Sequence, residues 1–222
     1  MTLPDGESIM TSDLKGISLL VFAIALFLGA CSENTHDRDF ADPVVGSTVD
    51  FDYISARDGR IRTLHEISYE VEVSGDFALT KSTSRVDQFN GTPYRISLAA
   101  FIGNDSALMI HAEKVADLSG ASDYSNLPQA EWPDETFRSS GHVCLEIPAE
   151  EVEGEHDLQW LQNNGFEPAG TMLFAQYFAT TADRNTEIVI SILQHVPACD
   201  DENANLKIIR DFQARTSVPK IE

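Results

Sequence analysis

Histidine, cysteine and glutamate gather in one short stretch of this chain, and together they could bind a metal ion. His142, Cys144 and Glu146 occupy alternate positions, and His156 follows shortly after them. Spacing of two places the first three on one face of a β-strand, with neighbouring Cβ atoms about 6 to 7 Å apart. That separation is wide for a compact tetrahedral site. We therefore predict no metal and no cofactor, which leaves Cys144 as either a reactive thiol beside His142 or a disulfide partner.

A second cysteine ends an apolar stretch near the start of the chain. The apolar run from Ile17 to Phe27 leads directly into Leu28-Gly29-Ala30-Cys31. A helix that spans a bilayer needs about 20 apolar residues, whereas a signal-peptide core needs about 7 to 15. The stretch from Gly16 to Ala30 therefore has the length of a signal-peptide core.

This arrangement resembles the lipobox of bacterial lipoproteins. The resemblance implies cleavage between Ala30 and Cys31, a lipid on Cys31 that anchors the protein to the membrane, and, from Ser32, sorting to the outer membrane. An uncleaved anchor with an unlipidated cysteine is the alternative. Translation could begin at Met1 or at Met10, because the latter start would remove Asp5 and Glu7 from a segment that is usually basic.

The resemblance divides the chain into three parts. Residues 1–30 would be the lipoprotein signal peptide, 31–48 a lipidated polar tether, and 49–222 a single β-rich globular domain. In the oxidising cell envelope, Cys144 and Cys199 would remain as an even pair. We therefore predict a Cys144–Cys199 disulfide, worth about 4 kcal/mol in the chain-entropy description.

Charge excludes one class of partner. The chain has 36 acidic residues against 15 Lys and Arg, for a net charge of −21. Nucleic-acid binding requires clustered Lys and Arg that neutralise phosphates, so we exclude it. The acidity could serve solubility in a salty medium or a site for a cation or a basic partner. The acids are spread along the chain, which favours solubility.

Alternation of apolar and polar residues predicts a β-rich domain after residue 49. The clearest alternation runs from Ile61 to Val73, broken only at Leu64, and predicts one long antiparallel strand. Asp58-Gly59 and Asn90-Gly91 are typical hairpin turns. The remaining strands are expected at 49–53, 85–89, 94–102, 107–115, 143–147, 172–180 and 187–196.

Two segments have helical spacing instead. Residues 155–164 end at Asn164-Gly165, a C-cap signal, and residues 204–214 follow acids that suit a helix N-terminus. The predicted fold is mainly β with two short helices, as an antiparallel meander, a sandwich or a barrel-like sheet. The alternative is α+β, with an antiparallel sheet carrying helices on one face.

Two sets of residues are candidates for binding a ligand. The segment 117–137 is predicted as a long loop in which Tyr124 and Trp132 either form a binding lip or hold the loop on the sheet. A barrel could also enclose an apolar cavity for a hydrophobic ligand. The residues that would line this cavity are Ile67, Tyr69, Phe174 and Ile190.

The chain contains no catalytic motif that names a reaction. It has neither a Gly-x-Ser-x-Gly elbow nor a His-Glu-x-x-His helix, and His65 and His111 lie in apolar patterns typical of core histidines. We therefore predict a non-enzymatic, membrane-anchored binding or accessory module of the cell envelope, facing the periplasm or the surface. Alternatives are an inhibitor- or immunity-type module whose acidic surface meets a basic protein, and an envelope hydrolase.

Overall fold

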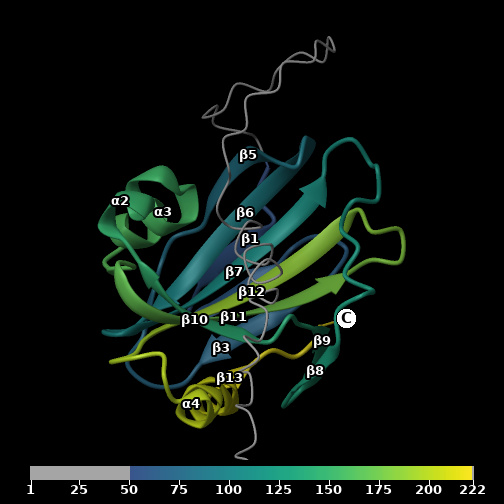
Figure 1. Cartoon of the computed structure of the whole chain (residues 1–222). Coiled ribbons are helices and arrows are strands. Elements are labelled where there is room, and N and C mark those ends of the chain that lie inside the picture. The colour runs from purple at the N-terminus through teal and green to yellow at the C-terminus, as the bar shows by residue number, and fades with distance from the viewer. Residues whose placement is uncertain (1–50, 222) are drawn as a thin grey trace, which may run out of the picture. The chain divides into compact units, whose positions relative to one another are not determined.

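The computed structural model describes residues 51–221, which form two antiparallel sheets and three helices (Figure 1). The expected signal peptide, the cleavage and lipidation site at Ala30 and Cys31, and the tether lie outside the described residues. Within residues 51–221, no helix combines the length and the hydrophobicity needed to cross a bilayer.

The larger sheet has nine strands, and its centre joins two hairpin systems that are distant in sequence. The first is β4–β6–β7, with β5 also paired to β6, and the second is β12–β11–β9–β8, with β10 also paired to β11. The two systems meet where β7 pairs with β12. The strands are β4 (Ala78–Leu79), β5 (Thr83–Phe89), β6 (Thr92–Ile102), β7 (Ser106–Val115), β8 (Gln129–Trp132), β9 (Glu135–Arg138), β10 (His142–Ile147), β11 (Gly170–Thr180) and β12 (Thr186–His195).

The smaller sheet has four strands in the order β1–β2–β3–β13. Asp58 and Gly59 form the β1–β2 turn with φ of 54° and 72°, the positive values that a two-residue hairpin requires. The strands are β1 (Ile54–Arg57), β2 (Arg60–Thr63), β3 (Glu70–Val73) and β13 (Thr216–Ser217).

Apolar side chains of the two sheets pack together in one buried cluster. Ile54, Ile61 and Val71 of the small sheet join Ile110 and Ile190 of the large sheet in this cluster, and all five are fully buried. The fold is therefore mainly β, with antiparallel sheets in two packed layers. Neither sheet closes on itself, so the barrel-like variant of the prediction is not the one observed.

The helices cover opposite faces of the large sheet. Helix α4 (Glu202–Ala214) adds Ile209 and Phe212 to the cluster between the sheets, and α3 (His156–Asn163) lies with α2 (Ala149–Gly154) on the other face. Figure 1 shows α2 and α3 well separated from α4. Residues 51–221 contain three helices rather than the two predicted for them, because residues 149–154 form a helix of their own.

The prediction of one continuous strand from Ile61 to Val73 is wrong, but the predicted alternation of buried and exposed side chains is confirmed. β2 ends at Thr63 and β3 begins at Glu70, because the Thr63 hydroxyl donates to Ile67 O and accepts from Tyr69 N. The chain thus turns back on itself within the expected strand. Alternate side chains nevertheless stay buried through the turn.

Two other predictions differ in detail. The first strand begins at Ile54 rather than at residue 49, with Phe51 and Tyr53 stacked just before it. The segment 117–137 is not one long loop, because residues 129–138 form the β8–β9 hairpin.

Candidate functional site

The predicted disulfide is present and removes Cys144 from any metal site. It joins Cys144 of β10 to Cys199 ahead of α4, with the two Cα atoms 5.4 Å apart. His142 Nε2 instead lies 3.1 Å from Glu202 Oε1 at the first residue of α4. Among the described residues, no group of three or more His, Cys, Asp or Glu side chains could hold a metal ion.

The four residues expected to line an apolar cavity do not share one face of the sheet. Ile67, Tyr69 and Ile190 are buried in the cluster between the two sheets. Phe174 lies on the opposite face of β11, because it alternates with Leu173, which belongs to that cluster. A cavity lined by all four residues is therefore not formed.

Tyr124 and Trp132 also lie on different faces. Trp132 is buried, packs edge-on against Tyr177 at 4.8 Å and donates its Nε1–H to Thr216 O at 3.0 Å. Tyr124 stacks on Phe178 at 4.2 Å, on the other side of the large sheet. Both side chains hold their segments onto the sheet, so they do not form one binding lip.

The most unusual polar feature is a pair of buried glutamates where β7 meets β12. Glu113 and Glu187 are register partners, only 6% and 2% exposed, and their side chains hydrogen-bond each other. Burial and the charge of Glu187 raise the pKa of Glu113 well above its ordinary value. Burial also raises the pKa of Glu187. Two carboxyls so close together share a proton rather than ionise together.

Residues of the loop after β7 cover this acid pair. The Tyr124 side chain hydrogen-bonds Glu187, Ser122 lies beside them, and burial beside the two acids raises the pKa of Tyr124 far above its usual range. Tyr94 of β6 lies in the same environment, which raises its pKa to about 12. Each of these hydroxyl groups therefore stays protonated and can donate to a carboxyl oxygen.

An ion-pair network next to the acid pair fixes α3 on the sheet. Asp157 of α3 lies 2.7 Å from Arg85 Nη2 and 3.2 Å from His111 Nε2, and Arg85 Nε lies 3.1 Å from Asp87. Burial alone would raise the pKa of Asp157, but the charges of His111 and Arg85 outweigh it and lower that pKa. The pKa of Asp157 is thus lowered, whereas those of Glu113 and Glu187 beside it are raised.

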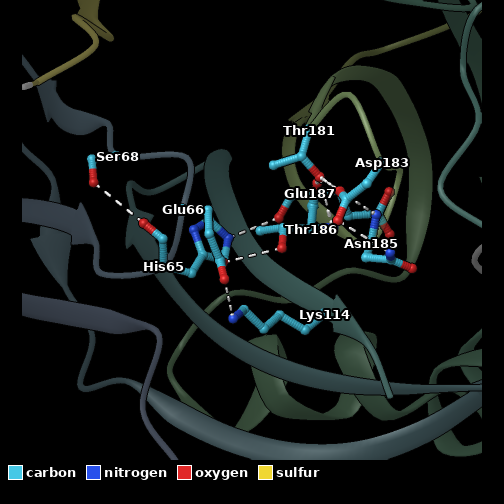
Figure 2. Close-up of polar contacts among 9 residues, drawn as sticks. All are labelled: His65, Glu66, Ser68, Lys114, Thr181, Asp183, Asn185, Thr186 and Glu187. Carbon is cyan, nitrogen blue, oxygen red and sulfur yellow. Dashed lines mark hydrogen bonds and ion pairs between the residues drawn. The ribbon is translucent and has the colours of Figure 1, made fainter. Parts of the chain in front are cut away.

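The opposite face of the same strand ends carries a second polar set, drawn in Figure 2. Glu66 accepts from Lys114 Nζ at 2.5 Å and from Thr186 Oγ1 at 3.1 Å, while His65 Nε2 lies 2.9 Å from Glu187 O. Burial lowers the pKa of His65, so its imidazole is neutral near pH 7. These contacts attach the β2–β3 turn to the centre of the large sheet.

The β11–β12 turn supports the loop that covers the acid pair. Asp183 accepts from Thr181 Oγ1 at 2.5 Å and from Asn185 N at 3.2 Å (Figure 2). Asn185 Oδ1 in turn accepts from Gly120 N at 2.8 Å, and Arg184 pairs with Asp123 at 2.7 Å. The loop is therefore connected to the acid pair by its side chains and to the turn by both the backbone of Gly120 and the side chain of Asp123.

We compared the chain with known proteins at the level of family, sequence and structure. No family model matches it, and neither does a curated protein or a solved structure. The site is therefore interpreted from its own geometry.

This geometry can hold a proton and position charges, but it is closed to solvent. His111 is 3% exposed and contacts Asp157, which meets part of the requirement for a general base. Glu113 and Glu187, which lie near this pair, hydrogen-bond each other, and Tyr124 hydrogen-bonds Glu187. The arrangement favours a structural role that fixes the register of β7 and β12 and the position of α3.

Sequence reasoning identified His65 and His111 as core histidines but missed the acid pair. The available signal was that Glu113 and Glu187 lie in near-continuously apolar strands of the kind that are buried on both faces, where an acid is rarely found without a partner. The partner of each was not apparent, because β7 and β12 are far apart in the sequence.

Proposed function

We propose that this chain is a lipid-anchored protein of the bacterial cell envelope, with a β-rich domain that acts as a non-enzymatic binding or accessory module. The feature that carries the proposal is Cys31 at the end of Leu28-Gly29-Ala30-Cys31, directly after a short apolar run. Lipid on that cysteine would tether the domain without any amphipathic surface of its own.

The Cys144–Cys199 disulfide supports the location. Disulfides persist in oxidising compartments such as the periplasm and the cell surface, and are rare in the reducing cytosol. The bond links β10 to the segment just before α4, on the face of the large sheet that α4 covers.

The buried site supports a role in binding rather than catalysis. The acid pair and the neighbouring ion-pair network lie beneath the loop that follows β7, and their polar groups contact one another. Buried polar networks of this kind usually rigidify a fold. Three of the residues first considered for a hydrophobic ligand are packed between the sheets. We therefore place the binding function on the outer surface of the domain, which carries most of the acidic residues.

Metabolic labelling with a clickable fatty acid, followed by intact mass spectrometry, tests the anchor. We expect the wild-type chain to carry the label and to begin at Cys31. Cys31→Ser should abolish labelling, whereas the matched control Cys144→Ser/Cys199→Ser should keep it. An unprocessed and unlabelled wild-type chain would overturn the proposal.

A protein-interaction module with a basic partner is the form of binding that the net charge of −21 favours. Capture of a basic envelope protein that weakens steeply with rising salt would support it, because surface charge attraction is screened. Capture that is insensitive to salt would count against it.

A further inference from the structure

Basic residues are scarce in this chain, yet three arginines lie together on the β1–β2 hairpin. Arg57 and Arg60 are register partners beside the turn, and Arg62 pairs with Ser55 one step further along the strands. Alternation places these four side chains on the outer face of the small sheet, opposite buried Ile61. They gather three of the 15 cationic side chains of the protein at one place.

These residues line a pocket. Its walls are Ser55, Arg57, Asp58, Arg60 and Arg62, and its volume is ≈ 210 Å³. Sites for drug-sized ligands are larger, about 300 to 1,000 Å³. The pocket therefore suits a small polyatomic anion rather than an extended ligand.

Two of the arginines are already oriented by glutamates of β3. Arg60 Nε lies 2.8 Å from Glu72 Oε1 and Arg60 Nη1 lies 3.3 Å from Glu70 Oε1, while Arg62 Nε pairs with the other oxygen of Glu70. These contacts engage Nε and Nη1 of Arg60 and Nε of Arg62, whereas each guanidinium has five N–H donors. The glutamates thus fix the guanidinium planes and leave donors available.

Arg57 differs from both neighbours. Within the part of the chain that the structure describes, it makes no ion pair, and its side chain is exposed. Asp58 adds one negative charge to the lining, and Glu70 and Glu72 of β3 balance Arg60 and Arg62, so Arg57 is the arginine of the pocket without an acidic partner among the described residues. An oxyanion would supply the missing partner of Arg57 and accept from the oriented donors of Arg60 and Arg62.

We propose that this pocket binds a phosphate group, with Arg57 as its principal ligand and Ser55, Arg60 and Arg62 as supporting donors. Phosphate matches the donors because arginine forks bind its oxygens in pairs, and Ser55 supplies a hydroxyl. The group could be free phosphate or the phosphodiester of a lipid headgroup. The proposal does not depend on lipidation of Cys31.

Nuclear magnetic resonance of the arginine side chains in the full chain, kept in a zwitterionic detergent, tests the site. One titration uses inorganic phosphate and the other uses short-chain phosphatidylglycerol, each against sodium chloride at matched ionic strength. We expect saturable shifts of the Arg57 Nε–Hε signal with one or both phosphate probes. Shifts with the lipid alone would assign the headgroup, and shifts with phosphate alone would assign the free anion.

Variants separate this site from general charge attraction. Arg57→Gln should weaken binding by about tenfold or more, and Arg57→Lys should recover part of it, because a lysine keeps the charge and loses the fork. Arg95→Gln, an equal charge change at an exposed position of β6, should leave binding unchanged. No saturable shift with either probe, the same shifts in chloride, or equal losses in Arg57→Gln and Arg95→Gln would each overturn the proposal.

Discussion

Clusters of charged residues in two regions of this protein differ in their exposure to water and therefore in the strength of their electrostatic interactions. In the cluster around β7 and β12, the charged groups are largely shielded from water, with His111 3% exposed and Asp157 13% exposed. On the outer face of the small sheet, Arg60 and Glu72 are both 46% exposed. The same kinds of ion pair therefore operate in a low dielectric in one region and in a high dielectric in the other.

Burial also gives the inner cluster opposite responses to pH. The raised pKa values of Glu113 and Glu187 contribute stability below the ordinary glutamate pKa, and this contribution is lost as pH rises through the raised values. The lowered pKa of Asp157 contributes stability above the ordinary aspartate pKa, and this contribution is lost as pH falls.

Removing Arg85 should produce the largest difference between the two regions. Arg85→Ala leaves the shielded carboxylate of Asp157 without its closest cation, at a cost of about 3 to 5 kcal/mol in the free energy of unfolding. The matched exposed variant Arg62→Ala should cost about 1 kcal/mol or less. Urea unfolding measures both, and similar losses in the two variants would show that the inner network is effectively solvated.

Replacing one acid of the buried pair should flatten the pH dependence of stability. Glu113→Gln keeps a donor for Glu187 and removes a group that must ionise in the folded state as pH rises. We expect the variant to gain about 1 to 3 kcal/mol over the wild type at pH 8 and to lose this advantage near pH 4. Stability curves across that range measure the effect.

The counterpart of that change on the outer face of the small sheet is Glu70→Gln, a glutamate 14% exposed whose partners Arg60 and Arg62 are each 46% exposed. It removes a partner of Arg60 and Arg62, so we expect a change of about 1 kcal/mol or less that shrinks further in high salt. A pH profile of Glu113→Gln that parallels the wild type would contradict proton sharing in the buried pair.

Removing the hydroxyl that covers the acid pair should have a smaller effect. Tyr124→Phe keeps the stacking on Phe178 and loses the hydrogen bond to Glu187, which should cost about 1 kcal/mol. Tyr53→Phe is the control, because Tyr53 contacts Phe51 and Lys114 through its ring. Equal unfolding free energies for the two variants would show that the Tyr124 hydroxyl contributes nothing.

The smallest effect should come from the Arg60–Glu72 pair on the outer face of the small sheet. Glu72→Gln breaks one contact between two half-exposed side chains, so we expect about 0.5 kcal/mol or less at low salt and no difference in 1 M salt. Chemical unfolding at the two salt concentrations measures it. A loss that persists in 1 M salt would place this pair with the buried network.

Local patterns predicted much of the secondary structure. The strands expected at 94–102, 107–115 and 187–196 match β6, β7 and β12 to within two residues at each end, and Asn90-Gly91 forms a hairpin turn with both φ angles positive. These features depend on residues adjacent in sequence, whose backbone preferences act before any tertiary contact.

The long strand was wrong for an equally local reason. Thr63 has a hydroxyl that can replace backbone partners, and it closes a turn onto Ile67 and Tyr69. Burial follows side-chain direction, so the alternation of buried and exposed positions continues through that turn. Period-two patterning thus predicts which residues face the core better than it predicts where a strand ends.

By itself, the sequence determined the turns, most strand positions and the disulfide partners. Only the tertiary structure decided that Glu113 faces Glu187 and that Asp157 reaches Arg85 and His111. The physical reason is that the first set follows from neighbouring residues, whereas the second depends on which distant strands pair and in which register. A shift of one residue in that pairing would turn every one of these side chains to the other face.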